Sequence, residues 1–306
     1  MSSFDAAVIG SGPAGVTAAL YLVRSGCSVI LFEKMAAGGQ ILQTEALENY
    51  PGYPKGIKGY ELADLFAAHL EGLPVTHSRD AVESVSGEAG GFVVQAGGKQ
   101  HSCRTVIVCS GAHHRELGLA DEKRLQGRGV SYCALCDGNF FRNAPVAVVG
   151  GGNAALEESL YLARLASKVY VIHRRDEFRG AKIYQDKLEA MPDKVELVRS
   201  SVVTALHGEN ALTGLSVRKT DEIRQIPVEG LFIYVGFEPA TAYLPAALER
   251  DAQGFIVTDT EMRTSIPGIF AAGDVRSKLC RQVITAAGDG ATAAQAAFVF
   301  LEQLHV

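Results

Sequence analysis

The sequence lacks a strong excess of charge of either sign. Its formal net charge is −5 over 306 residues, so the basic surface that general nucleic-acid binding requires is missing. The N-terminus, MSSFDAAVIG, has neither the basic nor the apolar region of a secretory signal. No segment reads as the roughly 20 consecutive apolar residues that span a bilayer. We therefore expect no nucleic-acid partner, no membrane and a cytoplasmic location.

Cysteine is also scarce, at six residues in the whole chain. Four of them have no close partner in sequence: Cys27, Cys103, Cys109 and Cys280. Such spacing does not make a disulfide scaffold, and a reducing compartment is the default. The remaining pair, Cys133 and Cys136, therefore reads as catalytic or metal-binding before it reads as structural.

Hydrophobic residues make up 47% of the chain and glycines number 33, which suits an α/β protein with many tight turns. The length is about right for two domains. Residues 6–34 and 146–175 repeat one design, in which an apolar run, a glycine-rich turn, a helical pattern and a second apolar run follow each other. Each is a βαβ unit by periodicity. Two such starts predict two nucleotide-binding domains rather than one enlarged sheet.

Two further segments show a clear pattern. Residues 195–236 alternate apolar and polar positions, which predicts a small antiparallel sheet. Residues 284–304 read as one long helix near the C-terminus.

The first glycine-rich turn fits the dinucleotide pattern G-x-G-x-x-G through Gly10, Gly12 and Gly15. Glycines there let the backbone approach a pyrophosphate held at a helix N-terminus. Glu33 ends the second strand near the spacing of about 20 residues expected for an acid that binds a ribose hydroxyl. A carboxylate there disfavours a 2′-phosphate, so we expect an adenine dinucleotide such as FAD or NAD. A chance glycine-rich turn is the alternative.

The second glycine-rich turn is the G-x-G-x-x-A variant, with Gly150, Gly152 and Ala155 at its key positions. Where the first unit ends in an acid, this one ends in a basic cluster. The cluster consists of His173, Arg174, Arg175 and Arg179. Guanidinium groups match a phosphate dianion through bidentate hydrogen bonds, which predicts an NADP site. A solvated basic face is the alternative. A free-ribose site and an NADP site in one chain indicate a flavoprotein reductase.

The sequence Cys133-Ala-Leu-Cys136-Asp137 lies just before the first strand of the second domain. Its spacing lets two thiols close a small ring, and a nearby helix start favours a reactive thiolate. Asp137 is placed where a carboxyl could move the proton that thiol–disulfide exchange requires. A zinc site would need four ligands and finds no second pair at suitable spacing. An inert buried pair is the other alternative.

With these motifs together, the sequence resembles the low-molecular-weight thioredoxin reductases of bacterial type along essentially its whole length. The segments that carry the resemblance are GSGPAG (10–15), GGQ (38–40), ENYPG (48–52), GRGVSYCALCDG (127–138), GGGNAALEE (150–158), HRRDEFR (173–179), AAGDV (271–275) and RQVITAAGDG (281–290). The resemblance implies an α/β fold with two Rossmann-like dinucleotide-binding domains of the three-layer FAD/NAD(P) type, the second inserted into the first. An FAD-binding domain would comprise residues 1–114 and 245–306. An NADPH-binding domain carrying the cysteine pair would comprise 115–244.

The resemblance also implies site residues by position. FAD would contact Gly10, Ser11, Gly12, Pro13, Ala14, Gly15, Glu33, Lys34, Gly39, Gln40, Asn49, Asp274, Arg281, Gln282 and Val283. NADPH would contact Gly150, Gly152, Asn153, Ala155, His173, Arg174, Arg175 and Arg179. In the family, the cysteine here numbered Cys133 attacks the partner disulfide, Cys136 faces the flavin and Asp137 handles the proton. No metal is expected.

The implied function is electron transfer from NADPH through FAD and the Cys133–Cys136 disulfide to oxidised thioredoxin, in a homodimer. The NADPH domain would rotate between half-reactions about linkers near 112–116 and 238–241. His113 and His114 stand in the first linker, where such histidines are more often solvated than functional. Three alternatives stay open: a different thioredoxin-like carrier, a thiol oxidase of the same fold, and a non-catalytic redox sensor. The intact HRRDEFR segment argues against the oxidase.

Overall fold

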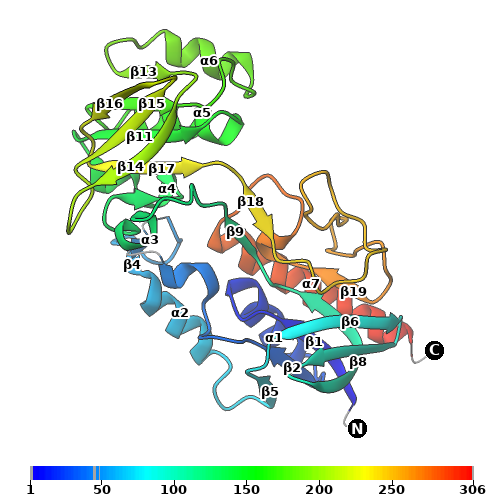
Figure 1. Ribbon diagram of the computed structural model, residues 1–306. Coiled ribbons are helices and arrows are strands. Elements are labelled where there is room, and N and C mark those ends of the chain that lie inside the picture. Colours follow the sequence, from blue (N-terminus) through cyan, green and yellow to red (C-terminus); the bar gives the residue numbers. More distant parts are fainter. Residues whose placement is uncertain (1–2, 44–45, 48, 305–306) are drawn as a thin grey trace. The chain divides into compact units, whose positions relative to one another are not determined.

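The structure is a computed structural model, and it describes residues 3–43, 46–47 and 49–304. The chain forms two compact units. Unit 1 comprises Met1–His113 and Glu238–Val306, and unit 2 comprises His114–Phe237. Unit 2 is therefore inserted into the sequence of unit 1 (Figure 1).

Unit 1 is built on a twisted sheet in the order β5-β2-β1-β8-β7-β6, with β19 beside β8. Its strands are β1 (Ser3–Ile9), β2 (Val29–Phe32), β5 (Val75–Ser78), β6 (Val82–Glu88), β7 (Gly91–Ala96), β8 (Lys99–Val108) and β19 (Ile269–Ala271). Strands β5, β2, β1, β8 and β19 pair in parallel, while β6, β7 and β8 form an antiparallel meander. The central parallel strands are continuous apolar runs because both of their faces are buried.

One face of this sheet is covered by two helices, α1 (Pro13–Arg24) and α7 (Val283–Gln303). They pack on each other closely, because a Cβ at Gly290 would lie 2.2 Å from the carbonyl oxygen of Ala14. The other face packs against the segment that carries Leu244 and Leu248, which lie in the same core cluster as Phe32. Unit 1 also holds α2 (Gly59–Ala68), the short helices η1 (Gly39–Gln43) and η3 (Gly273–Val275), and a small sheet of β3 (Ala46–Leu47) and β4 (Ile57–Lys58).

Unit 2 contains a parallel sheet in the order β10-β17-β11-β12-β13. Its strands are β10 (Val130–Ser131), β11 (Pro145–Gly150), β12 (Lys168–Ile172), β13 (Val195–Val198) and β17 (Gly230–Tyr234). A separate antiparallel sheet consists of β14 (Val202–His207), β15 (Gly214–Lys219) and β16 (Glu222–Ile226). Its helices are α3 (Glu122–Leu125), α4 (Ala134–Asp137), η2 (Gly138–Phe141), α5 (Asn153–Leu162) and α6 (Lys182–Glu189). Helices α4, α5 and α6 contribute to the core on one face of the parallel sheet, and β14–β16 to the core on the other.

The prediction of one antiparallel sheet over 195–236 is correct only for its middle part. Strands β13 and β17 join the parallel sheet instead. The reason is visible in β17, where Leu231, Phe232 and Ile233 are all buried, as in a strand covered on both faces.

The second boundary of unit 2 lies at 237/238, whereas the sequence placed it at 244/245. Residues 238–244 belong to unit 1 because Leu244 packs in its core and the carbonyl of Tyr243 accepts a hydrogen bond from the Val85 N–H at 3.0 Å. The first boundary lies at 113/114, one residue before its expected place.

The two segments that connect the units pair with each other as a two-stranded sheet of β9 (Ala112–His114) and β18 (Phe237–Pro239). His113 is exposed. The His114 ring is packed rather than solvated, with ring centroids 4.7 Å from Tyr132 and 4.4 Å from Phe237.

Helix α7 is apolar for its length. Among the described residues it is the one helix long and apolar enough to cross a membrane by length and composition, because alanine, valine, isoleucine, phenylalanine and leucine fill most of its positions. In the structure, Ala293, Ala294 and Ala297 of α7 are buried in the core cluster that also contains Val16 and Leu22 of α1. Its apolar side is therefore used in packing on α1.

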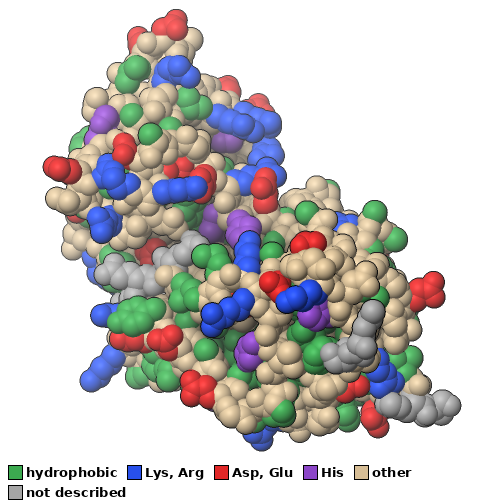
Figure 2. Space-filling view, turned by 60° about the horizontal axis from the view of Figure 1, so that its bottom comes forward, with side chains coloured by type: hydrophobic (Ala, Val, Ile, Leu, Met, Phe, Trp, Pro, Cys, Tyr) green, Lys and Arg blue, Asp and Glu red, His purple; other side chains and the backbone are tan. Residues whose placement is uncertain are grey.

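Acidic and basic side chains are interspersed on the face of the molecule that Figure 2 shows. This mixture agrees with the small net charge of −5.

Candidate functional site

The first glycine-rich turn connects β1 to α1, as predicted. A Cβ at Gly10, whose φ is +102°, would lie 2.5 Å from the Cys109 carbonyl oxygen, and one at Gly15 would lie 1.7 Å from the carbonyl oxygen of Gly10. These two glycines are needed for the turn itself and for close packing of the helix. A Cβ at Gly12 would meet nothing closer than 3.9 Å. The middle glycine thus leaves its backbone open, which is what a pyrophosphate requires.

Glu33 follows the end of β2, beside this turn. Its Oε2 accepts hydrogen bonds from the Ser11 N–H at 3.0 Å and the Ser11 hydroxyl at 3.1 Å, and its Oε1 accepts one from the Met35 N–H at 2.9 Å. These bonds orient the carboxylate at the mouth of the turn. Oε1, which accepts only one of these bonds, keeps a further lone pair with which it can accept a ribose hydroxyl. Pro13 begins α1, where its fixed φ suits the first helical position.

The second glycine-rich turn connects β11 to α5, and it too has one glycine closed by packing and one with an open backbone. A Cβ at Gly150 would lie 2.6 Å from the Tyr234 carbonyl oxygen, so this position is closed by packing. A Cβ at Gly152 would meet nothing within 4 Å, so its backbone is open. Ala155 is buried at the third position, and the Asn153 Oδ1 accepts a hydrogen bond from the Ala181 N–H at 2.8 Å.

The basic cluster after β12 divides into two kinds of residue. Arg174, Arg175 and Arg179 are exposed, as guanidinium groups that meet a phosphate must be. His173 is only 6% exposed, and its ring stacks on Phe178 with centroids 5.2 Å apart. The sequence placed these four residues in one group, whereas the structure gives His173 surroundings different from those of the arginines.

Cys133 and Cys136 form a disulfide, with their Cα atoms 5.3 Å apart. Cys133 caps the start of α4, and its Sγ accepts a hydrogen bond from the Cys136 N–H at 3.2 Å. Both cysteines are partly exposed. Of the four other cysteines, Cys103 and Cys109 are buried; burial raises the pKa of the Cys103 thiol to about 12 and that of Cys109 further. These two thiols are therefore poorly placed for thiolate chemistry.

Asp137 ends α4 and is tied to the strand before it. The Ser131 hydroxyl donates to Asp137 Oδ2 at 2.6 Å, and the Cys133 N–H donates to the Ser131 Oγ at 3.1 Å. The carboxyl is thus held one residue from Cys136, at the place predicted for a proton-transfer group.

A protein-family comparison now adds to this geometry. The model of the pyridine nucleotide-disulphide oxidoreductases matches residues 4–290. The chain belongs to this family. Membership confirms the predicted fold class, two Rossmann-like domains, and the predicted enzyme class, an oxidoreductase that couples a pyridine nucleotide to a disulfide.

The chain is also similar in sequence and structure to individual proteins over nearly its whole length. The chain is 43% identical over 305 residues to a protein named thioredoxin reductase from Listeria monocytogenes, covering 98% of this chain and 95% of that one. A crystal structure of thioredoxin reductase from Streptococcus pyogenes is 44% identical and covers 98% of this chain and 99% of that one, with a TM-score of 0.92. A Lactococcus lactis thioredoxin reductase in its FR conformation is 40% identical and covers 98% of this chain and 99% of that one, with a TM-score of 0.69.

Several residues predicted to contact FAD come together from distant parts of unit 1 of this oxidoreductase. Asn49 Nδ2 donates to Gln282 Oε1 at 3.1 Å, and the Gln40 amide donates to the carbonyl of Ala112. Gly39 lies against the first turn, because a Cβ there would be 3.3 Å from the Cα of Gly12. Val283 begins α7, and the exposed Lys34 follows Glu33.

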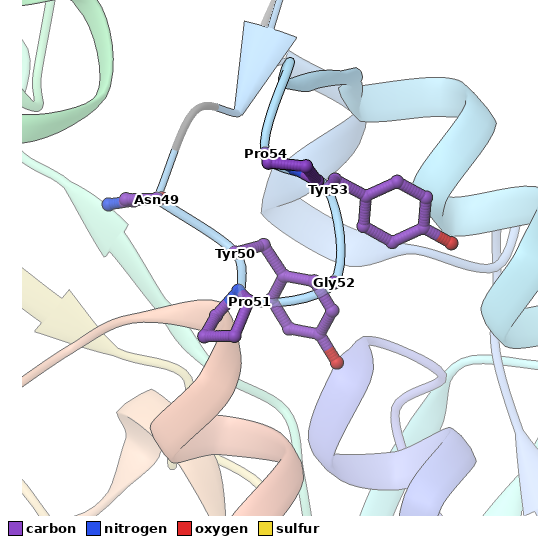
Figure 3. A pocket seen from close by; sticks show the side chains of 6 residues that line it. All are labelled: Asn49, Tyr50, Pro51, Gly52, Tyr53 and Pro54. Carbon is purple, nitrogen blue, oxygen red and sulfur yellow. The ribbon is translucent and has the colours of Figure 1, made fainter.

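The segment from Asn49 to Pro54 lines a pocket of about 320 Å³ (Figure 3). Tyr50 and Tyr53 pack near each other there, with ring centroids 6.2 Å apart, and Tyr50 also contacts Phe66 of α2 edge to face. This aromatic packing holds the loop that carries Asn49.

Asp274 in η3 fits a polar ligand on structural grounds. Its Oδ1 is buried and makes no hydrogen bond with any described residue. Burial raises the pKa of this carboxyl to about 6, while Lys278 and Arg281 lower it and Asp289 raises it. Because a buried, unsatisfied carboxyl oxygen is costly, a donor from a bound group would satisfy it. Arg281, beside it, lies with its guanidinium carbon 4.1 Å from the ring centroid of Phe255.

Two functional features escaped the sequence reading. Asp289 of α7 accepts hydrogen bonds that hold the Gly273–Asp274 turn, but nothing local to α7 marks it. Tyr234, at the end of β17, accepts a hydrogen bond from the Ala134 N–H at 2.6 Å and so fixes the start of α4. Asp289 acts on a residue 16 positions away in the chain, and Tyr234 on one 100 positions away. Only pairing data between distant positions could have indicated them.

Proposed function

We propose that this enzyme is a thioredoxin reductase, which passes electrons from NADPH through FAD and the Cys133–Cys136 disulfide to oxidised thioredoxin. One observation carries the proposal. A partly exposed Cys-x-x-Cys disulfide with an adjacent carboxyl occurs in one chain with two dinucleotide turns of opposite ribose chemistry. The enzyme uses FAD and NADPH, as expected for a pyridine nucleotide-disulphide oxidoreductase. Its similarity to named thioredoxin reductases supports thioredoxin as the substrate.

The described residues fit the two cofactors differently. The open backbone at Gly12, the carboxylate of Glu33 and the buried Oδ1 of Asp274 suit the pyrophosphate, ribose and polar chain of FAD. The remaining members of the proposed FAD set also belong to unit 1. The open backbone at Gly152 and the exposed arginines suit NADPH, because guanidinium groups bind a 2′-phosphate through paired hydrogen bonds.

When bound, FAD and NADPH supply a two-electron reduction of the disulfide. The cysteines then carry out thiol–disulfide exchange. In our proposal, Cys133 as a thiolate attacks one sulfur of the thioredoxin disulfide, and the other thioredoxin sulfur leaves as a thiolate and takes a proton. Cys136 then attacks Cys133, which re-forms the Cys133–Cys136 disulfide and releases thioredoxin as a dithiol.

Asp137 would serve proton movement in these steps. Its carboxyl is oriented by the Ser131 hydroxyl at 2.6 Å, and the same hydroxyl accepts from the Cys133 N–H. This links the position of the carboxyl to the backbone of the attacking cysteine. A general acid or base works only when it is held within hydrogen-bond reach of the proton that moves.

The cysteine pair and the NADPH turn both lie in unit 2, whereas the residues proposed for FAD lie in unit 1. Both must reach one flavin during turnover, so rotation of unit 2 between the half-reactions belongs to the function. The residues 112–116 and 238–241 are the proposed hinges. A homodimer and a cytoplasmic location complete the proposal, with neither nucleic acid nor a membrane as a partner.

The deciding experiment is an anaerobic titration of the purified, flavin-loaded enzyme with NADPH, followed by oxidised thioredoxin. We expect the flavin absorbance to bleach with NADPH and to return when thioredoxin is added. A Cys133→Ser variant should still bleach but should fail to turn over thioredoxin. Recovery of colour only with oxygen, and not with thioredoxin, would identify a thiol oxidase instead. Recovery only with another disulfide carrier would move the assignment to that carrier.

A further inference from the structure

The second glycine-rich turn and the basic cluster are one interlocked structure. The Gly151 carbonyl accepts hydrogen bonds from two N–H groups of the cluster's loop, Arg179 at 2.7 Å and Gly180 at 3.0 Å. The loop also lies close to Gly152, because a Cβ at Gly180 would be 3.1 Å from the carbonyl carbon of Gly152. The turn proposed for the pyrophosphate is therefore held by the backbone of the segment that carries the arginines.

The ring of His173 also lies against Gly151. A Cβ built on Gly151 would lie 2.3 Å from Cε1, 2.4 Å from Nδ1 and 2.6 Å from Nε2 of the His173 ring. Real Cβ contacts are essentially never closer than 3.0 Å, so the ring rests directly on the backbone of this glycine. Gly151 has no positive φ that would require glycine. The ring of His173 is therefore the reason that position 151 must lack a side chain.

The ring is itself held in place from behind. His173 stacks on Phe178 with an interplanar angle of 20°, and the guanidinium of Arg199 lies 5.2 Å from the Phe178 ring centroid. Arg199 in turn pairs with Glu189 of α6 at 2.6 Å. His173, Phe178, Arg199 and Glu189 thus contact one another in series, with His173 against Gly151. Such packing limits the movement of the turn.

The electrostatics separate His173 from the arginines. Burial lowers the pKa of His173, the guanidinium groups of Arg179, Arg175 and Arg174 lower it further, and a hydrogen bond with the Glu177 backbone raises it. The ring is therefore neutral at neutral pH. Its Nε2 is buried and has no hydrogen-bond partner among the described residues. A neutral, buried ring adds no charge toward a phosphate, whereas the arginines are exposed and charged.

We propose that His173 is a positioning residue that holds the pyrophosphate turn through Gly151, and that it does not contact the 2′-phosphate. The proposal differs from the sequence-based grouping of His173 with Arg174, Arg175 and Arg179 as residues that contact the nucleotide. The inference rests on the proposed NADPH site. Because NADPH and NADH share the pyrophosphate and differ in the 2′-phosphate, His173 supports the two cofactors equally.

The test measures KM and kcat for NADPH and for NADH in four enzymes: wild type, His173→Ala, Gly151→Ala and the double variant. Flavin content and circular dichroism verify folding of each. We expect His173→Ala to raise both KM values by the same factor, about three- to tenfold, with kcat changed less than twofold. Gly151→Ala should raise both KM values more, because its methyl group must displace the ring. The double variant should recover most of that loss, since the ring is gone.

Two results would overturn the proposal. A rise in KM for NADPH alone in His173→Ala would make the histidine a phosphate ligand. A double variant as impaired as Gly151→Ala would mean that the ring and the turn do not act on each other. If His173→Ala does not fold, Phe178→Leu removes the support of the ring and should raise both KM values in the same proportion.

The failure of this inference differs from failure of the NADPH site. The Arg174→Gln, Arg175→Gln double variant tests the phosphate site, and an unchanged KM for NADPH there would remove that assignment. The recovery in the Gly151 and His173 cycle can still be measured with NADH, so the two conclusions are separable.

Discussion

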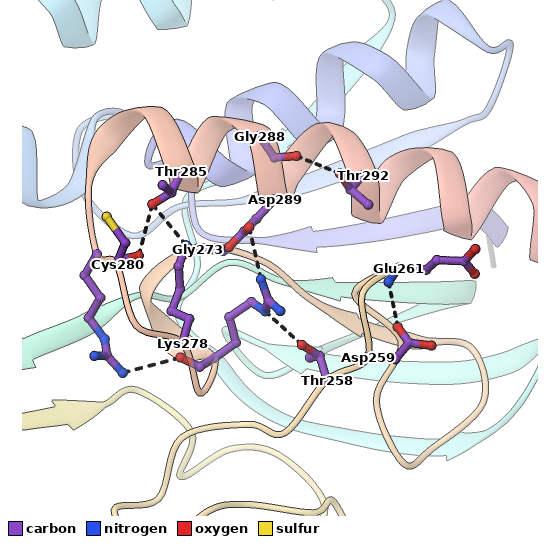
Figure 4. A network of polar contacts seen from close by, with 12 residues as sticks. Thr258, Asp259, Glu261, Gly273, Lys278, Cys280, Thr285, Gly288, Asp289 and Thr292 are labelled. Carbon is purple, nitrogen blue, oxygen red and sulfur yellow. Dashed lines mark hydrogen bonds and ion pairs between the residues drawn. The ribbon is translucent and has the colours of Figure 1, made fainter.

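Replacing Asp289 with asparagine should destabilise unit 1 and loosen the turn proposed to hold FAD. Asp289 lies on α7 and pairs with Arg276 at 3.0 Å and with Lys278 at 2.6 Å (Figure 4). It also accepts a hydrogen bond from the Gly273 N–H at 3.1 Å. The three charged side chains are only 12%, 12% and 9% exposed, so solvent screens them little.

The expected magnitude follows from this burial. Removing one member of a buried ion pair costs about 3–5 kcal/mol, because the partner charge is left uncompensated. Two cations are left here, but Arg276 keeps its hydrogen bond to Thr258 and Lys278 its bond to Thr285. Asparagine also retains one acceptor. We therefore expect Asp289→Asn to lower the free energy of unfolding by about 3 kcal/mol, or Tm by about 6–12 °C for a unit of this size.

The assay is unfolding by heat and by urea at fixed FAD, followed by circular dichroism and by release of flavin fluorescence. Flavin should leave the variant at lower denaturant than the wild type, because the Gly273–Asp274 turn has lost its anchor. The matched control is Glu261→Gln, which removes an exposed ion pair with Arg263 whose side chains are 50% and 53% exposed. That change should stay within about 0.5 kcal/mol. A loss in Asp289→Asn no larger than in the control would refute the reasoning.

Three further predictions follow from single features. Burial, with a smaller contribution from the neighbouring carboxylate, raises the pKa of Glu158 from 4.5 to about 7. The protonated form is favoured in the folded state, so its stabilisation is complete below pH 4.5 and is lost as the pH rises through 7. Glu158→Gln should therefore match the wild type near pH 4.5 and exceed it by about 1–2 kcal/mol at pH 8, as urea unfolding at the two pH values will measure. An equal difference at both pH values would contradict this. Gly15→Ala should yield enzyme without bound flavin, because its Cβ would lie 1.7 Å from the Gly10 carbonyl oxygen; normal flavin absorbance would rule that packing out. Replacing both Arg174 and Arg175 with glutamine should raise KM for NADPH by about tenfold or more and leave NADH use little changed. Equal losses with both cofactors would disprove the phosphate assignment.

The sequence alone indicated the parts of this protein whose physical causes are local. A glycine-rich turn lies within a few residues of the strand and helix that it joins, so its pattern predicts both the backbone and the ligand class. The charge at the end of the following strand has the same property, which is why Glu33 and the arginines could be recognised. The cysteine pair was also readable, because three residues of spacing suffice for a disulfide.

Only the tertiary structure decided which side chains support those motifs. His173 belongs to the basic cluster by sequence, but it is buried and packed on Gly151, 22 positions earlier in the chain. The Asp289 network joins α7 to a turn 16 residues away in sequence, and Tyr234 reaches α4 across 100 residues. The end of unit 2 likewise depended on whether Leu244 enters the core of unit 1. These features arise from packing between distant segments, for which local propensity and spacing provide no signal.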